Sequence, residues 1–70
     1  MRVLGIDPGY AIVGWGVIEQ EGIRFKAVDF GAVCTQAGVP FEQRLVQVYE
    51  GIKQVCETYK PEALAIEKLY

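Results

Sequence analysis

The sequence contains no histidine, only two cysteines, and no apolar run that approaches the roughly 18 residues of a membrane-spanning helix. Cys34 and Cys56 do not form a C-x-x-C motif, so a zinc site is not expected, and we interpret both as buried, reduced thiols. The N-terminal residues run directly into a strand pattern without the layout of a signal peptide. These absences predict a cytoplasmic protein with no membrane partner.

An excess of basic residues is also missing, since the formal net charge is −2. Proteins that bind nucleic acids usually carry such an excess, so this charge taken alone argues against a nucleic-acid partner. The argument has little weight because we expect the chain to be incomplete. It stops three residues after Glu67, without a turn, cap or polar tail. Residues 1–70 are therefore expected to be the N-terminal part of a single domain.

The residues that are present fall into a β-β-β-α-β pattern. Apolar or alternating runs predict the strands, and a polar segment of hairpin length separates the second strand from the third. The predicted strands are Arg2–Asp7, Ala11–Ile18, Ile23–Thr35 and Ala63–Glu67, and the polar turn is Glu19–Gly22. In the third strand Phe25 and Ala27 share one face, whereas Val28 and Phe30 share the other. This change of face indicates a β-bulge or burial on both faces.

A helix is predicted over about residues 40–60, between the third and fourth strands. Pro40 suits the first helical position, Glu42 and Lys60 lie where they favour the helix dipole, and Pro61 stops the helix. Apolar residues at spacings of three and four form one stripe along it: Phe41, Leu45, Val48, Ile52, Val55, Cys56 and Tyr59. The stripe predicts that the helix packs on the sheet.

The order of these elements predicts an α/β fold with a mixed sheet. Short turns join the first three strands, so these strands are expected to form an antiparallel meander. The helix is long enough to serve as a crossover, so the fourth strand is expected to run parallel to one of the meander strands. If that partner is the first strand, Asp7 and Glu67 emerge at the same edge of the sheet.

Two carboxylates, Asp7 and Glu67, close the first and last of these apolar strands. Neighbouring strands lie about 4.8 Å apart, so two such groups repel each other unless a cation lies between them. Oxygen ligands favour Mg²⁺, or Mn²⁺, over zinc. The more ordinary interpretation is that Asp7 belongs to an Asp-Pro-Gly turn and Glu67 is simply solvated.

A cation at this place would suit phosphoryl transfer or phosphodiester hydrolysis by two metals. Two carboxylates are too few for two metals, so at least one more acid is expected beyond Tyr70. Lys68 is either a solvated charge or a phosphate contact, and Tyr70 is either a core aromatic or a surface that stacks on an unpaired base. Gly14 and Gly16 either keep one sheet face flat for a packed helix or give a phosphate or DNA strand access to the backbone.

Several motifs together resemble the RuvC Holliday junction resolvases, over the whole length of this chain. They are Leu4-Gly5-Ile6-Asp7-Pro8-Gly9, Gly14-Trp15-Gly16-Val17-Ile18, Arg44-Leu45, Pro61-Glu62 and Ala65-Ile66-Glu67-Lys68-Leu69-Tyr70. The Asp-Pro-Gly element is moderately specific by itself. Its combination with Ala-Ile-Glu-x-x-aromatic at this distance is strongly specific.

The resemblance implies a ribonuclease H-like fold, with the fourth strand parallel to the first. It also implies Mg²⁺-dependent symmetric nicking of four-way DNA junctions by a homodimer that works with a branch-migration motor. Asp7 matches the family's first catalytic acid and Glu67 its second. Tyr70 matches an aromatic position, usually Phe, that inserts at the opened junction, and Lys68 lies beside these residues. The family's final pair of acids and its dimer-forming helices have no counterpart here, so residues 1–70 alone are expected to be inactive.

Two other functions remain as alternatives. An actin-like or sugar-kinase ATPase domain shares the opening strand-Asp-x-Gly hairpin. Pro8 lacks the N–H, and Tyr10 lacks the small hydroxyl, that a phosphate-binding loop uses at this place. A RuvC-like nuclease that processes RNA ends is the second alternative. The ending Glu67-Lys68-Leu69-Tyr70 favours the junction resolvase over it.

Overall fold

The computed structural model describes residues 1–9 and 11–67, which form four strands and one helix. In chain order these are β1 (Arg2–Pro8), β2 (Ile12–Glu21), β3 (Arg24–Cys34), α1 (Phe41–Tyr59) and β4 (Ala63–Ile66). The β-β-β-α-β order is the predicted one. The predicted turn at Glu19–Gly22 is wrong, because Glu19 and Gln20 continue β2 and pair with β3. The turn consists of Gly22, with a φ of 62°, and Ile23.

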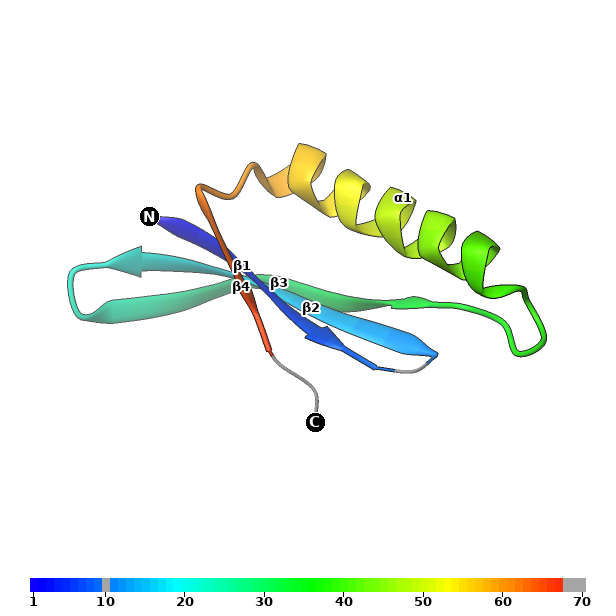
Figure 1. The fold of residues 1–70 in the computed structure, drawn as a ribbon. Helices are drawn as coiled ribbons and strands as arrows, with labels where there is room; N and C mark the ends of the chain where they lie inside the picture. Colours follow the sequence, from blue (N-terminus) through cyan, green and yellow to red (C-terminus); the bar gives the residue numbers. More distant parts are fainter. Residues whose placement is uncertain (10, 68–70) are drawn as a thin grey trace.

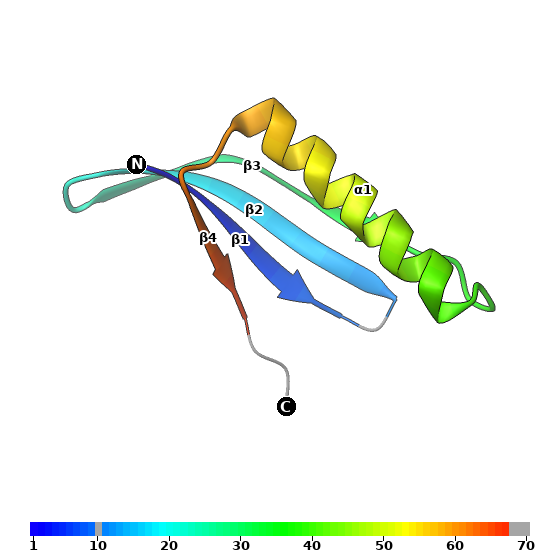
Figure 2. The same ribbon diagram turned by 45° about the horizontal axis from the view of Figure 1, so that its top comes forward.

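The four strands form one mixed sheet in the order β3-β2-β1-β4. β1 pairs with β2, and β2 with β3, in antiparallel fashion, whereas β4 runs parallel to β1. Figure 2 shows β1 and β2 in the middle of the sheet, with α1 crossing over its β2–β3 side. The prediction that the fourth strand pairs with the first is therefore confirmed.

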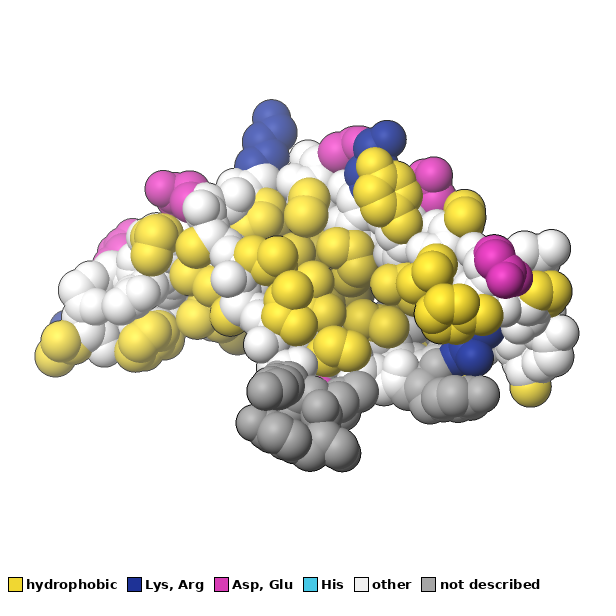
Figure 3. Space-filling model, viewed as in Figure 1, with side chains coloured by type: hydrophobic (Ala, Val, Ile, Leu, Met, Phe, Trp, Pro, Cys, Tyr) yellow, Lys and Arg dark blue, Asp and Glu magenta, His cyan; other side chains and the backbone are white. Residues whose placement is uncertain are grey.

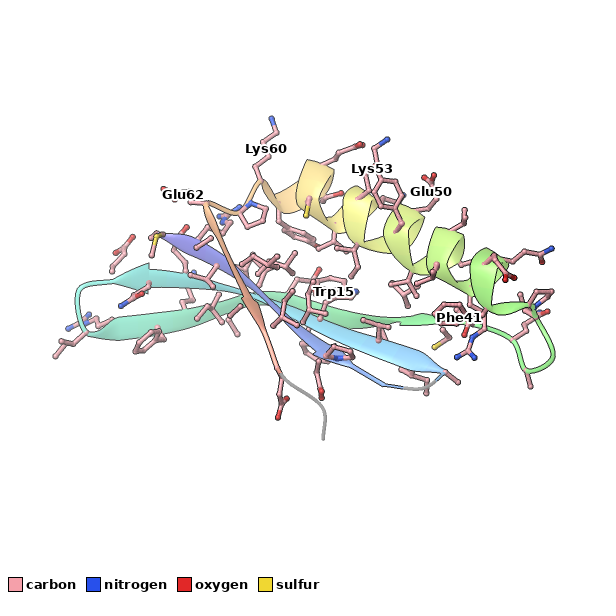
Figure 4. The ribbon with its side chains drawn as sticks, in the orientation of Figure 1. Trp15, Phe41, Glu50, Lys53, Lys60 and Glu62 are labelled. Atoms are coloured by element: carbon pink, nitrogen blue, oxygen red, sulfur yellow. The ribbon has the colours of Figure 1, made fainter. Side chains whose placement is uncertain are left out.

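α1 packs on one face of this sheet (Figure 1). The buried residues Leu4 of β1, Val17 of β2 and Val55 of α1 form the centre of the core. Leu4 and Val17 are also directly paired across the β1–β2 ladder, and paired residues share a face. Around this centre pack Ile6, Trp15, Ile52, Cys56 and Tyr59. Figure 4 shows Trp15 between the helix and the sheet.

Only the C-terminal half of α1 contributes to this core. Val55 is 8% exposed, whereas Phe41 and Leu45 in the first turns are 67% and 55% exposed. Glu50 and Lys53 project from the side of the helix that faces away from the sheet (Figure 4). Hydrophobic side chains consequently reach the surface along the space between helix and sheet (Figure 3). Within residues 1–9 and 11–67, no helix combines the length and the hydrophobicity that a membrane span requires.

The irregular alternation in the third strand is a β-bulge, one of the two predicted explanations. Val17 pairs with Asp29, but the next residue, Ile18, pairs with Ala27, so Val28 is the extra residue. The edge position of β3 also corrects the expectation of two buried thiols. Cys34 at the end of β3 is exposed, and Cys56 of α1 is half-buried.

Candidate metal centre

Asp7 lies near the carboxyl end of β1, where it pairs with Gly14 of β2. Leu4 and Ile6 belong to the core under α1, so the alternation of side chains along β1 turns Asp7 to the opposite face. The side chain is exposed. A Cβ added at Gly14 would lie 3.8 Å from the Cβ of Asp7, so glycine at this position leaves room beside the carboxylate.

Glu67 follows β4 directly. Its N–H donates a hydrogen bond of 2.9 Å to the carbonyl oxygen of Ile6, which continues the parallel ladder beyond the Ile6–Ile66 pair. This register aligns Glu67 with Asp7 on strands about 4.8 Å apart and puts both side chains on the same face. The structure thus brings together, at one edge of the sheet, the two acids that the sequence singled out.

The face that holds the two acids carries mostly small residues around them, with Phe30 on the edge strand β3 as the exception. Two rows cross the sheet on this face: Ala65, Gly5, Gly16 and Phe30, and beside them Asp7, Gly14 and Ala32. A Cβ added at Gly5 would come no nearer than 3.8 Å to a neighbouring atom, and one at Gly16 no nearer than 4.0 Å. Among residues 1–9 and 11–67, the helix packs on the other face only. An open surface depression of about 580 Å³ at this end of the sheet is lined in part by Asp7 and Glu67.

The turn that follows the first acid is held by contacts that the sequence did not predict. A Cβ at Gly9 would collide with the carbonyl oxygen of Ile12, so this turn requires glycine. The carbonyl oxygen of Ala11 accepts hydrogen bonds from the backbone N–H of Thr35 (2.9 Å) and from its hydroxyl (3.3 Å). Arg44 of α1 in turn donates from Nε to the Thr35 hydroxyl at 3.1 Å. In the sequence, Arg44 stands out only as part of a motif, and Thr35 only as the end of a strand.

The donor set fits a hard divalent cation. Mg²⁺ usually binds through one or two carboxylates and keeps several waters, so a pair of exposed, aligned carboxylates suits it. Zinc prefers nitrogen and sulfur ligands, which this pair does not offer. In the part of the chain that the structure describes, no group of three or more Asp, Glu, Cys or His side chains is close enough to hold a metal.

The other predicted site residues, Lys68 and Tyr70, lie outside the described residues, so their DNA contacts stay predictions. The remaining acids are distant from the pair. Glu19, for example, lies at the other end of β2. There it pairs with the N-terminal ammonium group at 3.2 Å and with Arg2 at 3.3 Å. The hydrogen bond from the ammonium group and the two positive charges lower the pKa of Glu19.

Known proteins share both this fold and the sequence of its strands. Residues 3–70 match the family model described as crossover junction endodeoxyribonuclease RuvC. The RuvC of Brevibacillus brevis is 47% identical over 70 residues, which are 100% of this chain and 42% of that protein. The structure of T. thermophilus RuvC in complex with a Holliday junction substrate superposes with a TM-score of 0.87 at 30% identity. The superposition covers 100% of this chain and 45% of the T. thermophilus RuvC chain.

The mixed sheet, its crossover helix and the parallel pairing of β4 with β1 define a ribonuclease H-like α/β fold. The chain belongs to the RuvC family of Holliday junction resolvases. It spans less than half the length of the relatives named above. The Aquifex aeolicus PPX-GPPA enzyme superposes with a TM-score of 0.73 but at 18% identity, which is a likeness of fold alone.

Proposed function

We propose that residues 1–70 are the N-terminal part of a nuclease domain that cuts branched DNA, and that Asp7 and Glu67 are two of its catalytic acids and metal ligands. The observation that carries this proposal is the alignment of the two carboxylates on adjacent parallel strands. Two like-charged carboxylates on adjacent strands repel each other, and a cation bound between them would offset this repulsion. The cation proposed is Mg²⁺, with Mn²⁺ as a substitute.

The contribution of this chain is to hold anionic oxygens in a fixed position. The β1–β4 ladder fixes the backbone of both acids, and the glycine beside Asp7 leaves the space above it open. Asp7 and Glu67 would hold the divalent cation, which would supply activation of water and stabilisation of the leaving 3′-oxygen in phosphodiester hydrolysis. Small residues at Gly5 and Gly16 allow a sugar-phosphate backbone to approach the sheet closely.

The substrate proposed is the four-way Holliday junction. Membership of the RuvC family and the likeness to a relative solved with such a junction support this choice. In this proposal Tyr70 stacks on an unpaired base at the opened junction, and Lys68 contacts a phosphate. The complete protein would act as a cytoplasmic homodimer, together with a branch-migration motor.

The site is proposed to be completed by acids outside residues 1–70. The acids of the described chain other than Asp7 and Glu67 lie on the polar face of α1, near the far end of β2, or in β3 and the turn before β4. They are Glu19, Glu21, Asp29, Glu42, Glu50, Glu57 and Glu62. Two-metal hydrolysis needs more carboxylates than the aligned pair provides. The isolated 70-residue chain is therefore expected to show no nuclease activity.

The test is a pair of isosteric substitutions in the complete protein, Asp7→Asn and Glu67→Gln. Each removes one anionic oxygen ligand without changing the size of the side chain. Cleavage of a synthetic four-way junction should fall by more than about 100-fold, because even groups that only support a metal ligand contribute 10–100-fold. Junction binding measured by gel shift without metal should be retained.

Glu21→Gln serves as the control, since Glu21 is an exposed acid at the opposite end of the sheet. It should leave cleavage unchanged. Mg²⁺-dependent nicking that survives at the wild-type rate in either the Asp7→Asn or the Glu67→Gln variant would overturn the assignment. Faster cutting of RNA ends than of junctions by the wild-type protein would overturn the choice of substrate.

A further inference from the structure

Arg2 and Glu62 form hydrogen bonds with each other just before the first pair of the β1–β4 ladder, at the end opposite to the two acids. The backbone N–H of Arg2 donates to Glu62 Oε1 at 3.1 Å. In return, the backbone N–H of Glu62 donates to the carbonyl oxygen of Arg2 at 2.8 Å. Figure 4 shows Glu62 at the corner where the chain leaves α1 and turns into β4, and Figure 1 shows the N-terminus beside this corner.

The Arg2 side chain adds two further connections. Its Nη1 donates to the carbonyl oxygen of Tyr59, the last residue of α1, at 3.0 Å. Its Nε donates to Glu19 Oε1 of β2 at 3.3 Å. Arg2 thereby joins β1 to the neighbouring strand β2, to the end of the crossover helix and to the start of β4.

Burial specifies the register of β4 only weakly. The ladder has four residue pairs, from Val3–Ala63 to Ile6–Ile66. The large side chains of β4, Leu64 and Ile66, are 58% and 61% exposed. A slip of one residue would exchange the two faces of β4 and move Glu67 away from Asp7. The polar contacts of Arg2 and Glu62 are therefore the specific interactions that align β4 with β1 at the start of the ladder.

We propose that Arg2 and Glu62 are positioning residues that set the β1–β4 register so that Glu67 falls beside Asp7. Asp7 follows Arg2 by five positions, and Glu67 follows Glu62 by the same five positions. The same register therefore pairs Arg2 with Glu62 at one end and Asp7 with Glu67 at the other. The effect of Arg2 and Glu62 on the β1–β4 register is argued from the fold alone. Their effect on metal binding rests on the proposed function.

The test compares Glu62→Ala with Glu62→Gln in the complete protein. Glu62→Ala removes the oxygen that accepts from the Arg2 N–H, whereas the amide oxygen of glutamine can still accept it. Two quantities are measured well below the unfolding temperature: the exchange rate of the Glu67 amide by NMR, and the dissociation constant of Mn²⁺ by electron paramagnetic resonance. The Glu67 amide reports the register directly, because its N–H donates a hydrogen bond to the carbonyl oxygen of Ile6.

Glu62→Ala should speed exchange of the Glu67 amide by about fivefold or more, as expected for the loss of one hydrogen bond. It should weaken Mn²⁺ binding by about 10–100-fold, as loss of a supporting residue does in other metal sites. Glu62→Gln should stay within about twofold of wild type in both, since its amide keeps the hydrogen bond. Glu21→Ala, an exposed acid at a strand end, is the control and should change neither.

If Glu62→Ala lowers the unfolding temperature but leaves both quantities at their wild-type values, the pair is merely structural and the proposal is wrong. If Glu62→Ala does not fold, Arg2→Gln takes its place. It keeps the backbone contact with Glu62 and loses the side-chain contacts with Tyr59 and Glu19, and it should move both quantities in the same direction. A wild-type protein that binds no Mn²⁺, but whose Glu67 amide still responds to Glu62→Ala, would overturn the metal site and support the role in register.

Discussion

The hydroxyl of Tyr59, in the last turn of α1, donates a hydrogen bond to Asp29 Oδ2 of β3. The other carboxylate oxygen of Asp29 accepts from the backbone N–H of Phe30 at 2.8 Å. The ring of Tyr59 also packs against Trp15, with 5.8 Å between ring centroids. This contact connects the end of the crossover helix, from which β4 departs, to the opposite edge strand of the sheet.

The Tyr59–Asp29 hydrogen bond makes stability depend on pH in two directions. The bond from the Tyr59 hydroxyl lowers the pKa of Asp29, and the same bond raises the pKa of Tyr59. The stabilisation from Asp29 is present above its unfolded pKa and is lost as pH falls through the lowered value. The stabilisation from Tyr59 is present below its unfolded pKa and is lost as pH rises through the raised value. Between about pH 4 and pH 10 the hydrogen bond therefore contributes in full.

Tyr59→Phe should remove this pH dependence. The substitution keeps the ring against Trp15 and removes only the hydroxyl, so the unfolding midpoint in urea should fall near neutral pH. The difference from wild type should shrink in acid, as pH falls through the lowered pKa of Asp29. Tyr49→Phe is the matched control, because Tyr49 lies on an exposed part of α1 and is itself 62% exposed. An equal midpoint for Tyr59→Phe and wild type at neutral pH would contradict this prediction.

Leu4→Ala should be among the most destabilising substitutions of the chain. Leu4 has no exposed surface and lies at the centre of the core with Val17 and Val55. Leucine-to-alanine changes at such positions cost about 2–5 kcal/mol, through lost transfer free energy and the cavity left behind. Urea denaturation of the complete protein measures this loss. Ile23→Ala, at a position that is 95% exposed, should change the free energy of unfolding little.

Gly31→Ala should disturb the packing of Trp15. A Cβ at Gly31 would lie 2.7 Å from Cζ2 of the indole and 2.9 Å from Cε2, so the ring must move. Overpacking of this kind costs about 1–3 kcal/mol. The emission maximum of the single tryptophan should shift at the same time. Gly16→Ala, where the nearest such contact is 4.0 Å away, should leave both stability and emission close to wild type.

Tyr70 and Lys68 are predicted to contribute to junction binding by different physical effects. Tyr70→Ala in the complete protein should weaken binding to an opened junction by about 1–3 kcal/mol, whereas Tyr70→Phe should retain the affinity because its ring still stacks. Lys68→Gln should reduce the slope of log affinity against log salt by about 0.9, the value for one phosphate contact. Fluorescence anisotropy over a salt series measures both. A Tyr70→Phe protein as weak as Tyr70→Ala would rule out stacking.

The fold followed from the sequence because its signals are periodic or local. The apolar stripe from Phe41 to Tyr59 predicted a helix that the structure places within a residue of its expected ends. The break in alternation around Val28 located the bulge. The hairpin turn was misplaced because Glu19 and Gln20 are polar yet remain in β2, at the end of the sheet where a strand can be solvated.

The alignment of Asp7 with Glu67 was also predictable, because each residue ends an apolar strand and the crossover helix before the last strand allows that strand to pair in parallel with the first. The polar contacts near the two ends of β1, including those that we propose set the register, were not predictable. Arg2 and Glu62 lie 60 positions apart, and Thr35 meets Arg44 through a single hydroxyl. Such contacts have no periodicity and involve residue types that are common on surfaces. Only the three-dimensional arrangement identifies them.

Arg2 and Asp7 are five positions apart on β1, and because this spacing is odd their side chains lie on opposite faces of the sheet. The guanidinium of Arg2 reaches the end of α1 on one side, whereas Asp7 faces the other, because successive side chains of a strand alternate. The side-chain contact of Arg2 with α1 and the carboxylate of Asp7 therefore lie on opposite faces of the sheet. Under the proposed positioning role, substitutions at positions 2 and 62 would change the alignment of the acids while leaving the face that carries Asp7 unaltered.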